Sequence, residues 1–296
     1  MEKIRLSHSA LKTFLTCERK FQLERLLEGD STREESSHLV YGKAYGVFVS
    51  TYLLTQDITA SLYKAWLEYW PIMEDDSKTE ETLVIACLAS VPNLELLLQD
   101  YEVSTFNFKP AVELSFRLDI DENCYFVGYV DVVLRNKLTG KMAILEVKTT
   151  GLSLFDLSPV FANSGQALGY SIILDQIVGE DQSEYEVIYL IAQLNKKTFG
   201  SVKVQLLTFQ KTLADRFNWF ISLSLDVERL GKMIEAQVFP LRGESCLQFM
   251  RPCQHFNTCQ LHNLDRPREL SKDEIDYQFT FQLEEVINNH IERIAK

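Results

Sequence analysis

The amino-acid sequence predicts an α/β fold in which a helical N-terminal region precedes a central β-sheet. Three observations lead to this prediction. Apolar side chains recur at helical spacing before residue 105, β-branched and aromatic residues dominate residues 112–149, and helical and strand-like patterns then alternate. Helices that alternate with strands in this way generally cover the faces of one sheet.

The N-terminal region is rich in helical patterns. Four helices are expected, over residues 6–28, 40–55, 59–70 and 80–101. Ser7 or Ser9 can cap the first helix, because a serine side chain accepts hydrogen bonds from free amides at a helix start. Pro92 is expected to kink or break the fourth helix, because proline lacks a backbone N–H.

The middle of the chain reads as a meander of three strands, over residues 112–119, 124–135 and 142–149. The later elements are a helix at 162–178, strands at 185–194 and 201–209, a helix at 212–235 and a helix at 273–294. No linker divides the chain, so we expect a single domain, 1–296. Its expected parts are a helical wing (1–105), a core (106–240), and a cysteine-rich segment with a C-terminal helix (241–296).

Composition and charge restrict the possible functions. The chain has 296 residues, 46% of them hydrophobic, and a net charge of −12. This acidity disfavours a general polyanion binder, although a basic groove can be local. No apolar run looks long enough to span a bilayer, and the N-terminus lacks the layout of a secretory signal. We therefore expect a cytoplasmic protein with no membrane partner.

Three charged residues interrupt two apolar strands. Asp131 lies within the second strand of the meander, and Glu146 and Lys148 lie within the third. Residues two apart on a strand project to the same side, so Glu146 and Lys148 share a face, and a hairpin can bring Asp131 beside them. Charges in such surroundings are costly unless they are paired or bind a metal.

Two kinds of explanation fit these charges. A structural salt bridge of Lys148, or a solvated sheet face, would account for the pattern without a function. A divalent-metal site would account for it too, because carboxylates are hard oxygen ligands suited to Mg²⁺ or Mn²⁺. A bound metal lowers the pKa of its water and polarises a phosphate, and an ammonium group stabilises the charge that develops.

The arrangement Asp131, then Glu146-Val147-Lys148, resembles the D…E-x-K signature of the PD-(D/E)XK nuclease superfamily, in particular its RecB-type branch. This resemblance implies a restriction-endonuclease-like fold, with a central mixed β-sheet flanked by helices. It also implies DNA phosphodiester hydrolysis, with Asp131 and Glu146 as catalytic metal ligands and Lys148 assisting the attacking water. Glu113 and the backbone carbonyl of Val147 would complete the metal site, although an exposed strand carboxylate is the alternative for Glu113.

Other segments are similar to the same branch. Gln166 and Tyr170 resemble its Q-x-x-x-Y motif, which implies a role in positioning DNA, although a buried helix face is the alternative. The stretch from Ser7 to Phe21 resembles the N-terminal helix of RecB-type and CRISPR-associated iron–sulphur exonucleases. The chain departs from the pattern at Gly46, which stands where the G-x-x-x-H segment of these enzymes has a metal-binding histidine, and His38 is poorly spaced to replace it.

The cysteines form a further constellation. Cys246, Cys253 and Cys259 are closely spaced near the C-terminus, as in a metal or iron–sulphur site. The resemblance implies a 4Fe-4S cluster whose fourth ligand is Cys17, so that the cysteine-rich segment closes on the N-terminal helix. Zinc, with His255 or His262 replacing one thiolate, is an alternative, and free buried cysteines are another. Cys87 and Cys124 are expected to lie in the core.

The expected function is a metal-dependent deoxyribonuclease, acting as an exonuclease on single-stranded DNA ends in recombination, repair or defence. A helicase or another recombination protein is a possible partner. Two other classes stay open at this point. One is a DNA- or partner-binding module that keeps the nuclease fold without catalysis, and the other is a cluster-bearing structural subunit of a larger complex.

Overall fold

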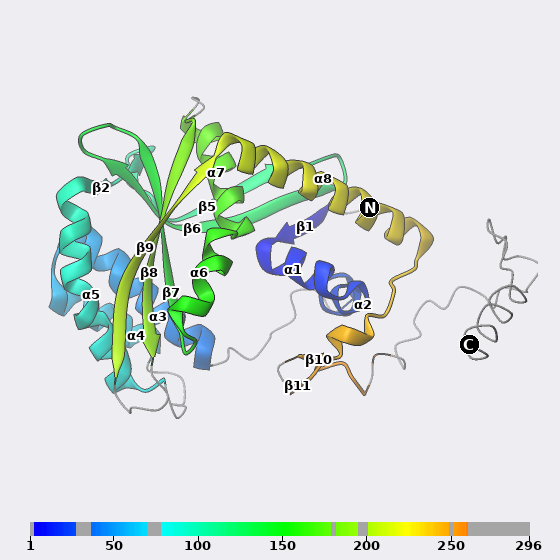
Figure 1. The fold of residues 1–296 in the computed structure, drawn as a ribbon, viewed down its shortest axis with the longest axis horizontal. Coiled ribbons are helices and arrows are strands. Elements are labelled where there is room, and N and C mark those ends of the chain that lie inside the picture. Colours follow the sequence, from blue (N-terminus) through cyan, green and yellow to red (C-terminus); the bar gives the residue numbers. More distant parts are fainter. Residues whose placement is uncertain are drawn as a thin grey trace, which may run out of the picture.

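A computed structural model describes residues 3–27, 37–69, 78–178, 182–194, 201–248, 251–257 and 259. Its centre is a seven-stranded mixed sheet built around β6 (Cys124–Asn136), the longest strand (Figure 1). The main path through the sheet runs β1 (Ile4–Ser7), β6, β7 (Met142–Thr150), β8 (Glu184–Leu194), β9 (Val202–Thr212). Two further strands, β2 (Tyr101–Val103) and β5 (Val112–Asp119), also pair with β6.

The strand directions make the sheet mixed. β6 is antiparallel to β2, β5 and β7, whereas β1 runs parallel to it. β7 is parallel to β8, which in turn is antiparallel to β9. The parallel β7–β8 pair requires a crossover, and helices α6 (Leu154–Ala162) and α7 (Gly165–Val178) supply it.

Helices cover both faces of the sheet (Figure 1). On one face α3 (Ser37–Thr55), α4 (Ile58–Tyr69) and α5 (Glu80–Asp100) enclose a core with the inward side chains of β7 and β8. On the other face, the second core is formed with α1 (His8–Thr16), α7 and α8 (Leu213–Ala236). The described residues therefore form three layers, and the predicted α/β class with a central mixed sheet is confirmed.

The meander and the long helix after it match the expected ranges closely. β5, β6 and β7 reproduce the three expected strands, and α8 reproduces the helix expected at 212–235. The side chains of Thr212 and Asp215 form a reciprocal capping box at the start of α8, which explains why it begins there. The helix expected at 273–294 lies outside the described residues.

The single helix expected over residues 6–28 is wrong. The segment begins with β1, continues as α1, breaks at Cys17, and resumes as α2 (Glu18–Phe21) and a π-helix, η1 (Gln22–Leu27). Ser7 does cap α1, since its side chain accepts from the amide of Ala10 at 3.2 Å. The strand is four residues long, too short for its pattern to stand out, and pairing with β6 fixes it. The expected wing thus also contributes β1 and β2 to the central sheet.

Pro92 does not break α5. The helix continues to Asp100 with the proline on its exposed side. Water can satisfy the carbonyl that loses its partner there, while buried Leu94 and Leu97 hold the helix against its neighbours. By length and composition α5 is one helix among the described residues that could cross a membrane, a property the sequence reading had excluded. Here Leu83, Ala86 and Leu94 pack in a protein core.

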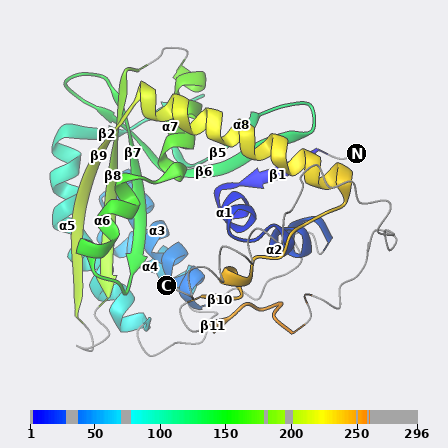
Figure 2. The ribbon, with the colours of Figure 1, turned by 45° about the vertical axis from the view of Figure 1, so that its right-hand side comes forward.

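The segment after α8 contacts the N-terminal helices (Figure 2). It contains a 3₁₀ turn, η2 (Gly243–Ser245), and a small hairpin of β10 (Leu247–Gln248) and β11 (Arg251–Pro252). A separate small hairpin, β3 (Thr105–Phe106) with β4 (Lys109–Pro110), precedes β5. Ser245 donates to the carbonyl of Thr16 at 2.6 Å, and Gln254 donates to Glu24 at 2.6 Å. These contacts join the two ends of the described chain.

Candidate active site

The hairpin of β6 and β7 places Asp131 opposite Glu146. The antiparallel ladder ends at the pair Val132 and Leu145, and the next residue on each strand is one of the two acids. The Asp131 carboxylate Oδ2 accepts a hydrogen bond of 2.8 Å from the backbone amide of Val147. The acids therefore meet where the two strands part, as the sequence predicts.

Glu146 is the most buried charged group of this cluster, with 1% of its side chain exposed. The ammonium nitrogen of Lys148 lies 2.7 Å from its Oε2. Apart from this ion pair, neither carboxylate oxygen of Glu146 has a hydrogen-bond partner among the described residues. Burial raises the pKa of Glu146 to about 7, an effect that Lys148 opposes and that the carboxylates of Asp131 and Glu113 reinforce.

Lys148 stays charged next to these acids. Burial acts to lower its pKa, but the negative charges of Glu146 and Asp131 outweigh burial and raise the pKa above its usual value. The three residues predicted as catalytic are therefore together in the structure. Their arrangement places the Lys148 ammonium group beside the Glu146 carboxylate, whose oxygens have few hydrogen-bond partners, at the edge of a buried core.

Glu113 occupies an irregular position on β5, with a φ of 49°. Its neighbours Val112 and Leu114 pair with the residues on either side of Asp131, so Glu113 stands opposite Asp131. Val112 packs into the core under α3 and α5, whereas Leu114 packs into the core under α1 and α7. The left-handed backbone at Glu113 thus accompanies a switch of faces along the strand.

Electrostatics link Glu113 to the other acids. Burial and the nearby Asp131 carboxylate raise its pKa, while Lys148 and Lys43 lower it. Lys43 comes from α3 and also forms an ion pair of 2.6 Å with Glu68. The sequence reading missed Lys43, since only the packing of α3 on the sheet brings it here.

The donor set suits a hard divalent cation. Glu113, Asp131 and Glu146 offer carboxylate oxygens, which Mg²⁺ and Mn²⁺ prefer, and the Glu146 oxygens lack hydrogen-bond donors. A bound metal ion would balance the negative charge of these oxygens, which burial separates from water. No three His, Cys, Asp or Glu side chains in the described ranges already stand close enough together to form a complete metal site.

Gln166 and Tyr170 face the site from α7. Gln166 Nε2 donates to the Tyr170 hydroxyl at 2.5 Å, which confirms that the two side chains share a helix face. Tyr170 is buried, and its pKa is raised by burial and by the negative charge of Glu146. The pair therefore lies within electrostatic reach of the acids.

His8 is a neighbour of the site to which the sequence pattern gave no role. Burial lowers its pKa, and the positive charges of Lys12 and Lys148 lower it further. Its buried Nδ1 has no hydrogen-bond partner among the described residues. His8 is the first residue of α1, directly after β1. No local sequence pattern marks it as a site residue, because its position depends on how α1 packs across the sheet.

Gly46 lies on α3, one turn after Gly42. A Cβ added at Gly42 would lie 3.6 Å from the Thr149 hydroxyl on β7, whereas a Cβ at Gly46 would meet nothing within 4 Å. The position of the expected family histidine therefore has open space around it. His38 is two turns earlier on the same helix.

The four cysteines expected as ligands are free thiols at the two joined ends of the chain. The Cys253 amide donates to the carbonyl of Cys246 at 2.8 Å. Burial raises the pKa of Cys259, with Arg19 opposing and the Cys17 and Cys253 thiols reinforcing this shift. The part of the chain described contains no ready-made metal-binding group, so an iron–sulphur cluster and zinc are not assigned by the structure.

The structure describes three of the remaining cysteines and histidines, Cys87, Cys124 and His255. Cys87 and Cys124 are fully buried core residues, as predicted. His255 is buried, with Nε2 3.5 Å from Glu24 and 3.0 Å from Gln254. His262 lies outside the described residues.

Comparison with known proteins identifies the class of this fold and site. The family model described as the PD-(D/E)XK nuclease superfamily matches residues 5–260, so the chain belongs to that superfamily. Membership implies a nucleic-acid substrate, and nucleases of this superfamily usually use divalent metal ions. The comparison with curated proteins gave no match.

A solved structure supports the fold. The chain is similar to a presumed exonuclease from Eubacterium rectale, with a TM-score of 0.51 and 14% sequence identity. The similarity covers 95% of this chain and 92% of that one. The mixed sheet flanked by helices is thus consistent with the restriction-endonuclease-like fold.

Proposed function

We propose that this protein is a metal-dependent deoxyribonuclease that acts as an exonuclease on single-stranded DNA ends. The observation that carries the proposal is the buried Glu146 carboxylate, ion-paired with Lys148 at 2.7 Å and flanked by Asp131 and Glu113. A structural salt bridge would need only one acid. The further carboxylates of Asp131 and Glu113, whose charges act on Glu146, are better explained by a cation that the acids share.

Each residue has a distinct role in this proposal. Asp131 and Glu146, with Glu113 and the backbone carbonyl of Val147, would hold Mg²⁺ or Mn²⁺. The metal would supply Lewis acidity and a more acidic bound water. Lys148 donates hydrogen bonds to the attacking water or to the phosphate oxygens, whose negative charge grows as the bond breaks. Gln166 and Tyr170 position the DNA backbone over the acids.

The direct test is digestion of end-labelled DNA by the purified protein with Mg²⁺, Mn²⁺ or EDTA. Linear single-stranded, linear double-stranded and circular single-stranded substrates are compared at equal nucleotide concentration. The proposal predicts release of mononucleotides or short products from linear single strands only, and only with metal. Cleavage of the circular strand, which has no ends, would show that the protein is an endonuclease and not an exonuclease.

An alternative function is a DNA- or partner-binding module without catalysis. Gly46, in place of the histidine that the family pattern expects, favours this alternative. Open space around Gly46 lets the Gly46→His variant be made without a clash at Cβ. If the wild-type chain binds DNA but cleaves none with any metal, while Gly46→His gains Mn²⁺-dependent cleavage, the alternative is correct for the natural chain.

We also propose that Cys17, Cys246, Cys253 and Cys259 ligate a 4Fe-4S cluster. The effect of the Cys17 and Cys253 thiols on the pKa of Cys259 and the contacts between the two chain ends support it. Thiolates suit iron–sulphur clusters and also zinc, the rival in which His255 replaces a cysteine. Anaerobically purified protein is expected to contain four irons and to lose them in a Cys253→Ser variant. Stoichiometric zinc without iron would favour the rival.

The biological setting is proposed on chemistry alone. A single-strand exonuclease acts on ends that unwinding exposes, so a helicase or another recombination protein in the cytoplasm is the expected partner. Recombination, repair and defence all supply such ends. Co-purification of a helicase with the tagged chain would support this setting. If the chain copurifies in a stable complex but shows no nuclease activity, it is instead a structural subunit.

A further inference from the structure

A cavity of about 470 Å³ lies between α1, the turn that joins α6 to α7, and α8. Its wall is mostly apolar and includes the indole of Trp219. His8, Lys12 and Asp226 bring the titratable groups that face it. A cavity of this size, with apolar walls and a few polar groups, is typical of sites that bind small organic ligands.

Two residues of the cavity wall, His8 and Gly165, connect it to the candidate active site. His8 lies on its wall with an unpartnered, buried Nδ1, and the charge of Lys148 acts on the same imidazole. On the other side Gly165 lines the cavity and directly precedes Gln166, which bonds to Tyr170 beside the acids. A ligand in the cavity would therefore contact His8, on which the charge of Lys148 acts, and the backbone that leads into Gln166.

Trp219 gives the cavity a fixed aromatic wall. A Cβ added at Gly165 would lie 2.9 Å from Trp219 Nε1, and one at Gly169 would lie 3.0 Å from the far end of the indole ring. Phe126 packs edge-on against the same ring, with centroids 5.6 Å apart. The indole is thus held against α7. Proteins that bind single strands use such fixed aromatic surfaces to stack bases.

The polar groups suit a nucleoside better than a bare phosphate. Asp226 is half-buried, and its carboxyl can accept a hydrogen bond from the exocyclic amino group of a base. The same carboxyl would repel a phosphate placed deep in the cavity. Lys12 is exposed at the wall, where its ammonium group can meet the sugar–phosphate backbone.

We propose that this cavity binds the nucleoside next to the cleaved phosphodiester of a single-stranded DNA end, with His8 and Asp226 as its hydrogen-bonding groups. The inference rests on the proposed nuclease function and adds a base-binding subsite to it.

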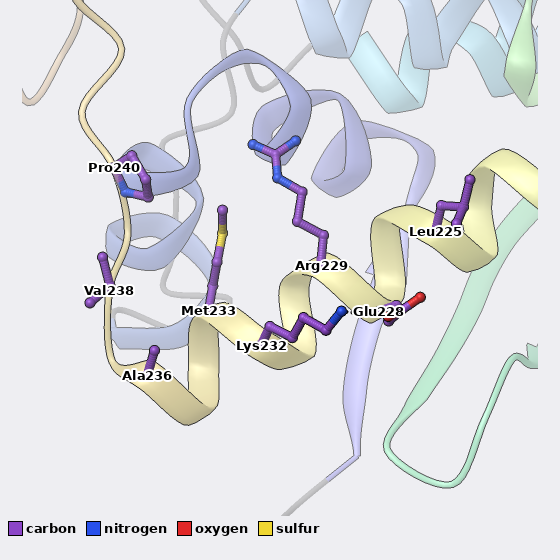
Figure 3. Close-up of a pocket in the computed structure, with 8 residues that line it drawn as sticks. All are labelled: Leu225, Glu228, Arg229, Lys232, Met233, Ala236, Val238 and Pro240. Carbon is purple, nitrogen blue, oxygen red and sulfur yellow. Dashed lines mark hydrogen bonds and ion pairs between the residues drawn. The ribbon is translucent and has the colours of Figure 1, made fainter. Parts of the chain in front are cut away.

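A second groove on α8 provides an internal control (Figure 3). It lies along the C-terminal half of the helix, and Arg229 and Met233 extend from it toward the N-terminal helices. Arg229 there is committed to an ion pair with buried Glu18. Glu228 lines this second groove, half a turn from Asp226, and is exposed and paired with Lys232 at 2.6 Å. Glu228→Gln is therefore a matched variant outside the proposed subsite.

The test measures binding of deoxynucleoside monophosphates, with deoxyribose 5-phosphate as the base-free probe, to the intact protein in EDTA by ligand-observed NMR. The wild-type chain is expected to bind nucleotides but not the base-free probe. His8→Ala and Asp226→Ala are expected to weaken binding about tenfold, as loss of a buried hydrogen bond does. His8→Gln should restore part of the affinity, and Glu228→Gln should change nothing. Val160→Trp, which fills the cavity from an exposed position, guards against misfolding of the alanine variants.

The same variants are then compared in metal-dependent DNA cleavage. A raised KM with kcat largely kept supports the subsite. Equal nucleotide affinity in the wild-type, His8→Ala and Val160→Trp proteins overturns it, as does a failure of any nucleotide to bind. If the protein cleaves DNA but its KM is unchanged in His8→Ala, Asp226→Ala and Val160→Trp, the subsite is overturned and the nuclease function is kept. Nucleotide binding that depends on His8, without any cleavage, supports the subsite and overturns the nuclease.

Discussion

Glu146 shows how the site works at the scale of single residues. Its carboxylate is removed from water, held by one ammonium group, and crowded by two other acids. Such a group is costly to keep ionised, and a pKa of about 7 reflects that cost. The folded chain keeps this unfavourable arrangement because the strands that carry it are fixed by their apolar neighbours. We infer that the arrangement is maintained for binding a cation.

The pKa of His8 gives a pH prediction. Its folded-state pKa lies below the ordinary value of 6.5, because burial disfavours the charged imidazolium. As the pH falls through 6.5, the unfolded chain therefore takes up a proton before the folded chain does, and the free energy of unfolding decreases. In EDTA, urea unfolding from pH 8 to pH 5 should show the wild type losing stability relative to His8→Gln. Parallel curves would show that His8 titrates normally in the fold.

The proposed catalytic residues were predictable because they belong to one hairpin. Two-residue spacing put Glu146 and Lys148 on one face, and the turn fixed Asp131 opposite. His8 and Lys43 reach the same place from helices that pack on the sheet from elsewhere in the chain. No local pattern reports that kind of packing, so the sequence reading assigned neither a place in the site.

At the scale of elements, the contact between α7 and α8 fixes the helix that carries Gln166 and Tyr170. Gly165 and Gly169 form a face of α7 without side chains, and Trp219 of α8 fills it. Gln166 and Tyr170 stand on the neighbouring face of the same helix. A shift of α7 away from α8 would therefore move both side chains.

Gly169→Val tests this contact. The added side chain would meet the Trp219 ring at 3.0 Å from its Cβ alone, so we expect the free energy of unfolding to drop by about 2 kcal/mol. Gly231→Ala is the control, because it lies within α8 with nothing within 4 Å of an added Cβ. There the helix propensity of alanine should stabilise the protein by about 0.5–1 kcal/mol. Equal effects of both variants in urea unfolding would contradict the packing described.

Elements were predicted best where their pattern was long. The 24-residue α8 and the strands of the meander match expectation, because many apolar positions define each of them. β1 and α6 were missed, since four and nine residues give little periodicity. Pro92 misled the reading because a proline on the exposed side of a well-packed helix costs one hydrogen bond without ending the helix.

At the scale of the whole molecule, Glu18 ties the N-terminal helices to α8 and to the segment beyond it. The carboxylate has 1% of its surface exposed and pairs with Arg229 and Arg242. Arg242 binds it through two nitrogens, at 2.8 Å and 2.7 Å. This bidentate contact connects residues 224 positions apart in the chain.

Glu18→Gln is expected to lower the free energy of unfolding by about 2 kcal/mol, because it removes the buried charge that two half-exposed arginines share. Hydrogen exchange of residues 243–248 should also become faster, since Arg242 anchors that segment. Glu228→Gln breaks an exposed pair instead, and should leave the free energy of unfolding almost unchanged. If Glu18→Gln is equally mild, the connection is not important for the fold.

The class of fold and the order of the longer elements were predictable from the sequence, but the contact between the two chain ends was not predictable from the cysteines alone. In the structure the contacts between the ends come from Glu18, Glu24, Ser245 and Gln254. These are polar side chains with no distinctive spacing. The cysteine pattern pointed to the same two segments, and its metal stays a proposal.

The central claim is that Lys148 and the three acids form a metal-dependent nuclease site. The most direct test is the initial rate of single-stranded DNA cleavage in Mn²⁺ by the wild-type, Lys148→Ala and Lys141→Ala proteins. Lys141 is exposed and directly precedes β7, so Lys141→Ala is a control for the loss of a lysine from the same hairpin. We predict that Lys148→Ala lowers kcat by about 100-fold or more when measured on the folded variant, while Lys141→Ala keeps wild-type activity. Metal-dependent cleavage that survives in Lys148→Ala would contradict the assignment of the site.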